Sequence, residues 1–260
     1  MEFQFDKYEG AGNDFIILED LDSRFPEGDS EWIHRLCDRH FGIGADGLIL
    51  VRASDRSDFR MLYYNSDGRP STLCGNGGRC VFAFAHDHNL VGAEGTFEAS
   101  DGIHRATILR DGSICLEMSN VTLVQKREKA LFLDTGSPHH VEWVEAVDSV
   151  DVQQRGAAIR YGAPYFDVGS NVNFVQQIGP VDFKIRTYER GVEGETLACG
   201  TGAVAAAIAA HFHGLATHTT LNIHAPGGKL MVSFTLAEGM YQNVQLTGAA
   251  RCVFSGNFSR

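Results

Sequence analysis

The sequence predicts an α/β (α+β) fold with two pseudo-symmetric halves, each a mostly antiparallel sheet wrapped around a central helix. Two observations predict it. Apolar and polar residues alternate along most of the chain, as they do in half-buried strands. In addition, two segments about half the chain apart are alike, Cys74-Gly75-Asn76-Gly77-Gly78 and Cys199-Gly200-Thr201-Gly202-Ala203, and a helical stretch follows each. We therefore expect one half at residues 1–122 with a C-terminal strand at 250–260, and the other at residues 123–249.

The expected strands fill most of both halves. In the first half they include the residues around Phe3 and Phe5 and the ranges 48–51, 59–64, 96–99, 107–110 and 114–118. In the second half they cover the ranges 141–147, 173–177, 183–188, 221–224, 230–235 and 241–246. Turns are expected at Asp111-Gly112, which is a hairpin signal, and at Pro226-Gly227-Gly228 and Glu238-Gly239. The charged stretch at residues 125–129 is expected to cross between the halves.

Four helices are expected. Ser30 is a candidate cap for one that continues to about Arg39, and Asp148 or Asp151 is expected to start another that ends near Arg160. The other two follow the paired cysteine segments, over residues 77–88 and 202–213. The last is apolar on nearly every side, which indicates a buried central helix.

Composition excludes several classes of partner. Lys and Arg number 22 against 33 Asp and Glu, without a basic cluster, so nucleic acid is not an expected partner. No run approaches the roughly 20 apolar residues of a membrane span. The N-terminal segment lacks the pattern of a secretory signal, so we expect a cytoplasmic protein. Most of the six cysteines are expected to be reduced core residues.

Two other motifs are set aside. The segment at residues 42–47 matches the glycine pattern of dinucleotide-binding proteins, but a helical stretch precedes it and a strand follows it, which is the reverse of what that site needs. Cys74, Cys80, His86 and His88 have no common zinc-site spacing, so no metal is expected.

The paired segments carry the chemistry. A cysteine at a helix N-terminus meets the positive end of the helix dipole and unpaired backbone N–H groups, which favour the thiolate. The adjacent glycines allow a carboxylate to approach the same N–H groups. Two such cysteines in similar halves suggest a pair that inverts a carbon, with one removing a proton and the other returning one. The alternative is two inert cysteines that follow glycine-rich turns.

Seven ordered segments span nearly the whole chain. They are Lys7-Tyr8-Glu9-Gly10-Ala11-Gly12-Asn13-Asp14-Phe15, Tyr64-Asn65-Ser66-Asp67-Gly68 leading into Cys74-Gly75-Asn76-Gly77, Gly136-Ser137-Pro138-His139, Asn171-Val172-Asn173-Phe174, and Glu189-Arg190-Gly191-Val192-Glu193-Gly194-Glu195-Thr196 running into Ala198-Cys199-Gly200-Thr201-Gly202. Together they resemble the diaminopimelate epimerase family, whose members interconvert LL- and meso-diaminopimelate in lysine and cell-wall synthesis.

The resemblance implies an isomerase that needs neither a metal nor another cofactor. Cys74 and Cys199 would be the acid/base pair, with His139 partnered with Cys74 and Glu189 with Cys199. The distal amino-acid head of the substrate would be bound by Asn13, Asn65, Asn171, Glu189 and Arg190. The backbone at Gly75-Asn76 and Gly200-Thr201 would hold the reacting α-carboxylate. The resemblance also suggests a homodimer.

Two positions depart from the family pattern. Ser137 stands where the family often has Asn before Pro-His, and Gly47 stands where a Gln is often found. Each departure removes an amide that could contact the substrate, so both bear on substrate fit more than on the type of reaction.

Other functions remain open. A racemase of histidine, proline or hydroxyproline on the same scaffold would keep both thiols, although a distal-head site favours a substrate with a second amino-acid end. A catalytically silent binding protein and a dithiol redox protein are the rivals from other classes. The redox reading is weakened by the wide separation of the two cysteines, because most dithiol enzymes use Cys-x-x-Cys.

Overall fold

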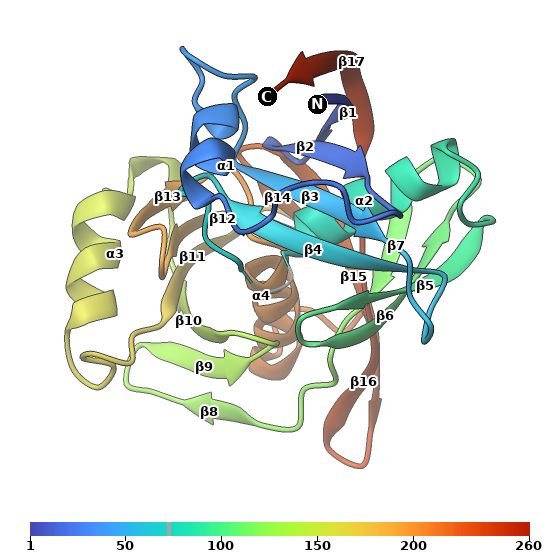
Figure 1. Ribbon diagram of the computed structural model, residues 1–260. Helices are drawn as coiled ribbons and strands as arrows, with labels where there is room; N and C mark the ends of the chain where they lie inside the picture. Colours follow the sequence, from blue (N-terminus) through green and yellow to red (C-terminus); the bar gives the residue numbers. More distant parts are fainter. Residues whose placement is uncertain (72–73) are drawn as a thin grey trace. The chain divides into compact units, whose positions relative to one another are not determined.

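The chain divides into two compact units. The computed structural model describes residues 1–71 and 74–260. Its first unit comprises Met1–Leu116 with Gly248–Arg260, and its second unit comprises Glu117–Thr247. Figure 1 shows that strands make up most of both.

Eight strands of the first unit form a sheet in the order β17-β1-β2-β3-β4-β5-β6-β7. The pairs β2–β3 and β4–β5 are parallel and the others antiparallel. The strands are β1 (Glu2–Gly10), β2 (Asn13–Glu19), β3 (Gly47–Arg52), β4 (Phe59–Asn65), β5 (Glu94–Ala99), β6 (Gly102–Ile108), β7 (Ile114–Glu117) and β17 (Arg251–Ser259). Helix α1 (Ser30–Cys37) connects β2 to β3, and α2 (Gly75–Asp87) packs against β1, β2 and β3. The chain ends meet because β17 pairs with β1 (Figure 1).

The strands of the second unit follow the order β8-β9-β10-β11-β12-β14-β15, with β13 also paired to β12. They are β8 (Val124–Lys126), β9 (Ala130–Asp134), β10 (Pro138–Trp143), β11 (Asn171–Gln177), β12 (Asp182–Glu189), β13 (Gly194–Thr196), β14 (Thr220–Ala225), β15 (Gly228–Ala237) and β16 (Met240–Gly248). The 3-10 turn η1 (Val147–Ser149) and α3 (Val152–Tyr161) lie between β10 and β11, and α4 (Gly200–His213) packs against β9 to β12, β14 and β15.

The two units repeat one pattern of strand pairing. From β17 to β6 the successive pairs are antiparallel, antiparallel, parallel, antiparallel, parallel and antiparallel. The same series runs from β8 to β15. The helices also correspond, because α1 and α3 precede the second strand of the first parallel pair, and α2 and α4 precede that of the second. The predicted fold of two similar α/β halves is confirmed.

Helix α4 is the core of the second unit. All residues from Ala203 to Ala210 are fully buried, as expected from the apolar residues on nearly every side of this helix. Small alanine side chains let strands approach the helix closely. The helix stops at Gly214, whose left-handed conformation (φ 82°) directs its N–H to the carbonyls of Ala210 and His211.

The helix starts differ from expectation in an informative way. Helices α2 and α4 begin at Gly75 and Gly200, two residues early, so both cysteines are themselves N-cap residues. Helix α1 is capped by Asp29 rather than Ser30, because the Asp29 carboxylate accepts the hydrogen bond from the Trp32 N–H. Asp151 caps α3, which was one of the two candidates.

Two further expectations are corrected, and one strand was missed. Residues 125–129 do not form a simple crossing segment, because they belong to the β8–β9 hairpin. The strand expected at 141–147 ends at Trp143, before the turn η1. Strand β2 was not predicted, because the run from Phe15 to Leu18 is buried at every position and shows no alternation. Among the remaining cysteines, Cys37 and Cys80 are buried as expected, but Cys252 is exposed.

Candidate active site

Cys74 and Cys199 occupy the same local position in their units. Each caps the N-terminus of a helix with an extended backbone, at φ −102° and ψ 125° for Cys74 and φ −112° and ψ 116° for Cys199. The Cys199 sulfur accepts a hydrogen bond from the Gly202 N–H at 3.3 Å. Because the positive end of each helix dipole faces its cysteine, both positions stabilise the thiolate form relative to a cysteine in water.

A chain of polar contacts leads to the Cys199 sulfur. Asn173, on β11, approaches His139 Nδ1 at 3.0 Å with its amide nitrogen, which can only donate. Nδ1 is therefore the acceptor, and Nε2 carries the proton that it donates to Thr201 Oγ1 at 2.9 Å. The Thr201 hydroxyl is then able to donate its own proton to Cys199 Sγ, 3.4 Å away. The series Asn173, His139, Thr201 and Cys199 is called the relay below.

The relay works with a neutral imidazole. His139 is completely buried, and this burial lowers its pKa to about 3. Both ring nitrogens are engaged inside the second unit, by Asn173 and Thr201. The structure thus connects His139 with the Cys199 thiol through Thr201, where the resemblance led us to expect a partnership with Cys74.

Asn173 is a site residue that the sequence analysis missed. Its side-chain oxygen accepts from Thr187 Oγ1 at 3.0 Å, and a Cβ added to Gly202 would lie only 2.5 Å from that oxygen. Glycine at position 202 is therefore required by the close approach of Asn173. The signal was present, since Asn173 is a polar residue on the same strand face as Asn171 and lies between the apolar residues Val172 and Phe174.

The residues of the second unit that the resemblance assigns to the distal head gather where β11 begins and β12 ends. The Asn171 amide nitrogen donates to Ser137 Oγ at 2.9 Å, and the Asn171 side-chain oxygen accepts from the backbone N–H of Arg190 at 2.9 Å. Ser137, a departure from the family pattern, is thus a partner of Asn171. Glu189 accepts a hydrogen bond from Thr196 Oγ1 at 2.5 Å. The structure therefore brings Asn171, Glu189 and Arg190 together.

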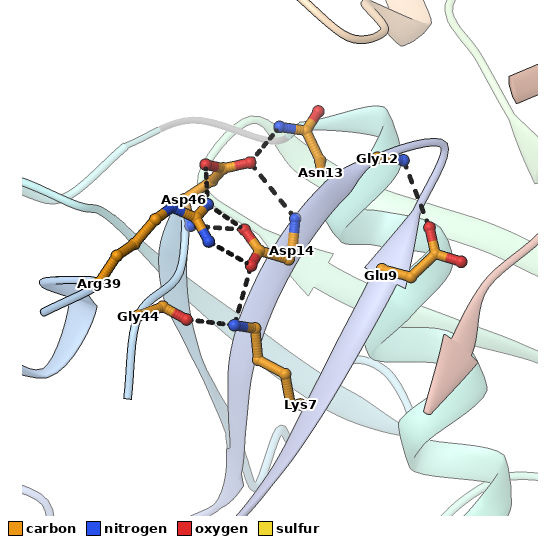
Figure 2. A network of polar contacts seen from close by, with 8 residues as sticks. All are labelled: Lys7, Glu9, Gly12, Asn13, Asp14, Arg39, Gly44 and Asp46. Carbon is orange, nitrogen blue, oxygen red and sulfur yellow. Dashed lines mark hydrogen bonds and ion pairs between the residues drawn. The ribbon is translucent and has the colours of Figure 1, made fainter. Parts of the chain in front are cut away.

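A charged network in the first unit holds Asn13, as Figure 2 shows. The Asn13 amide donates to Asp46 at 2.8 Å, and its oxygen accepts from the Asn76 amide of helix α2 at 2.5 Å. Arg39 contacts Asp14 through two hydrogen bonds of 2.9 and 2.7 Å and also reaches Asp46. The Asn13 side chain thereby ties the loop that carries Asp46 to the first turn of the helix behind Cys74.

Lys7 completes this network. Its ammonium group lies 2.8 Å from Asp14 and donates to the Gly44 carbonyl (Figure 2). Burial alone would raise the pKa of Asp14, but the hydrogen bonds from Arg39 and Lys7 outweigh it and lower that pKa to about 2. The Asp14 carboxylate therefore stays charged at neutral pH and keeps both cations in place.

Position 47 explains the second departure. Gly47 begins β3, and a Cβ there would lie 2.5 Å from the Tyr64 carbonyl oxygen and 2.6 Å from the Tyr63 ring. The ring of Tyr63, which packs edge-on against Phe15, fills the space of a side chain at this position. Asn65 lies opposite Gly47 at the end of β4, and its side chain is exposed.

Sequence comparison identifies the relatives of this chain. The model of the family described as diaminopimelate epimerase matches residues 5–124 and 131–253. The chain belongs to the diaminopimelate epimerase family. A diaminopimelate epimerase of Flavobacterium psychrophilum is 50% identical over 95% of this chain and 97% of its own length. One from Aquifex aeolicus is 36% identical over 98% of both chains.

Solved structures with the same fold have little sequence in common with this member of the diaminopimelate epimerase family. A phenazine biosynthesis protein of the PhzF family from Bacillus anthracis superposes with a TM-score of 0.79 at 14% identity, over 100% of both chains. A hydroxyproline epimerase from Agrobacterium vitis gives 0.69 at 15% identity, over 98% of this chain and 92% of its own. These likenesses establish the fold alone.

Within residues 1–71 and 74–260, no three His, Cys, Asp or Glu side chains are grouped so as to hold a metal ion. None of the helices in the same ranges has the length and apolarity to cross a bilayer.

Proposed function

We propose that this chain epimerises LL-diaminopimelate to meso-diaminopimelate without a cofactor, in lysine and peptidoglycan precursor synthesis. The observation that carries the proposal is the pair Cys74 and Cys199, each capping the central helix of one unit with the same backbone conformation. Relatives named diaminopimelate epimerase, up to 50% identical over nearly the whole chain, support the substrate.

The proposed mechanism uses both cysteines as acid and base. One thiolate removes the α-proton, and the other cysteine, as a thiol, donates its proton to the opposite face of the resulting carbanion. Backbone N–H groups at Gly75-Asn76 and Gly200-Thr201 bind the α-carboxylate and stabilise the negative charge that develops beside it. Exclusion of water strengthens these interactions.

The relay gives His139 and Thr201 a role in this proposal. A neutral His139 holds the Thr201 oxygen as an acceptor, which leaves the Thr201 proton directed at the Cys199 sulfur. The Thr201 hydroxyl and the Gly202 N–H thus provide two hydrogen bonds to a Cys199 thiolate. Both stabilise the charged form more than the neutral one.

The distal head of the substrate is assigned to Asn13, Asn65, Asn171, Glu189 and Arg190. Asn171, Glu189 and Arg190 support this assignment because they meet at one place in the second unit. A substrate with a second amino-acid end has complementary charges for Glu189 and Arg190, whereas proline has no group to place there. A racemase of histidine, proline or hydroxyproline remains the alternative.

We also propose that the protein is a cytoplasmic homodimer. Its two domains would be residues 1–122 together with 250–260, and residues 123–249.

The first experiment is proton NMR of the reduced protein with LL-diaminopimelate in heavy water. We expect loss of the α-proton signal and appearance of the meso form. Absence of exchange would overturn the proposed substrate, and histidine and proline would be tested next. Cys74→Ala and Cys199→Ala should each abolish epimerisation, while Cys252→Ala, which alters an exposed cysteine outside the paired segments, should retain it. Full activity in either of the first two variants would contradict the two-base mechanism.

A further inference from the structure

Arg79 is a fully buried cation beside the first turn of α2. None of its surface is exposed, and its guanidinium folds back toward the helix N-terminus. There it donates to the Gly75 carbonyl at 3.3 Å and to Asn76 Oδ1 at 2.8 Å. Its Nε has no hydrogen-bond partner among the described residues. Burial of a charge at this depth is costly unless a counter-charge lies nearby.

No protein carboxylate within residues 1–71 and 74–260 lies within ion-pair distance of Arg79. The groups that favour its charged form are Cys80 on its own helix, Cys74 at the N-cap of that helix and Glu9 on β1. Burial lowers the pKa of Arg79, yet an arginine stays protonated in proteins. An anion must therefore be supplied by one of these three groups or by the substrate.

Two of the three groups are poor counter-charges. Complete burial raises the pKa of the Cys80 thiol far above neutrality, so this group stays uncharged. Glu9 is 30% exposed and directs its carboxylate to the Gly12 N–H (Figure 2). Before substrate binds, Cys74 remains, and as the N-cap of the helix it already has the dipole that favours a thiolate.

The second unit has no counterpart of this cation. Arg79 is the fifth residue after Cys74, and the fifth residue after Cys199 is Val204, which is also fully buried. Helix α4 contains no Lys, Arg, Asp or Glu. On its own helix, Cys199 is within hydrogen-bond distance of two neutral groups, the Thr201 hydroxyl and the Gly202 N–H.

We propose that Arg79 is a positioning residue that makes Cys74 the thiolate of the resting enzyme, while Cys199 rests as the thiol. The inference rests on the proposed function, in which both cysteines act as acid and base. The two thiols are then unequal before substrate binds. The epimer whose α-proton meets Cys74 encounters the resting form, and its turnover moves one proton onto Cys74 and one from Cys199 to the product. The opposite direction must begin from the reversed protonation state.

The test is the alkylation rate of each cysteine by iodoacetamide as a function of pH, resolved by peptide mass spectrometry. Burial slows alkylation, but the pH of half-maximal rate reports ionisation. In the unaltered protein we expect this midpoint to be lower for Cys74 than for Cys199 by about one pH unit or more. Equal midpoints, or a lower midpoint for Cys199, would overturn the proposal without any variant.

Variants of Arg79 then test whether its positive charge causes the difference between the two midpoints. Arg79→Met should raise the Cys74 midpoint by about one pH unit or more and shift the Cys199 midpoint by less. Arg79→Lys keeps the charge and should largely restore the low midpoint. Val204→Met, the matched change in α4, should move neither midpoint. A folded Arg79→Met protein with an unshifted Cys74 midpoint would refute the role of Arg79.

The two proposals fail separately. If the protein exchanges no α-proton of diaminopimelate yet shows the lower Cys74 midpoint, the proposed substrate is wrong and the inequality of the thiols stands. If exchange proceeds and the midpoints are equal, the function stands and the role of Arg79 is wrong.

Discussion

His139→Gln should make the stability of the protein less sensitive to acid. The buried imidazole has a pKa of about 3, against the ordinary value of 6.5. Below pH 6.5 the unfolded chain takes up a proton at His139 that the folded chain does not, so stability is fully present above that pH and is lost as the pH falls toward 3. Gln has a donor and an acceptor at the end of its side chain but no proton to gain in this range.

The magnitude follows from the size of the shift. Each pH unit below 6.5 lowers the free energy of unfolding by about 1.4 kcal/mol while the folded imidazole remains neutral. The loss is therefore about 2 kcal/mol at pH 5. Urea unfolding of the wild type and of His139→Gln at pH 8 and pH 5 measures this directly. The wild type should lose about 2 kcal/mol more than the variant between the two pH values. Equal losses would show that His139 is protonated in the folded protein, and the tautomer assigned to the relay would then be wrong.

Three further predictions concern the relay and the glycines. Thr201→Val keeps the shape of the side chain but removes the hydroxyl beside Cys199. The kcat should therefore fall by about 10- to 100-fold, as expected for a lost hydrogen bond to a charged group. An unchanged kcat would show that Thr201 has no part in the mechanism. Gly202→Ala should lower the free energy of unfolding by roughly 1–3 kcal/mol through the clash with Asn173, whereas Gly77→Ala, whose Cβ meets only ordinary contacts, should not; equal effects would contradict the asymmetry. Gly47→Ala should cost a similar roughly 1–3 kcal/mol in urea unfolding, against less than about 0.5 kcal/mol for Gly28→Ala, which meets nothing within 4 Å.

The repeated cysteine segments made the fold predictable. They placed both central helices to within two residues at their starts, and the alternation of polar and apolar residues placed most strands. Strand β2 was not predicted because its residues from Phe15 to Leu18 are buried on both faces. Such burial removes the alternation of polar and apolar residues on which the prediction of strands depends.

The contacts of the candidate site were far less predictable. The ion pairs among Lys7, Asp14 and Arg39 join residues from different elements, and neither spacing nor periodicity reports such partners. The relay likewise joins β10, β11 and α4, so the link of His139 to Thr201 became visible only with the strand register. Arg79 is a related case, because a charged residue in an amphipathic pattern is ordinarily expected at the surface.

The shared order of strand pairing in the two units is what duplication and fusion of one ancestral gene would leave behind. An ancestor with two copies of a single unit would have had two identical cysteines, each with the same neighbours, and each mutation would have altered both at once. Fusion into one chain would have released the copies from that constraint. The two halves now differ at equivalent places, with Arg79 against Val204 and with more space around Gly77 than around Gly202, as expected if each copy then changed on its own.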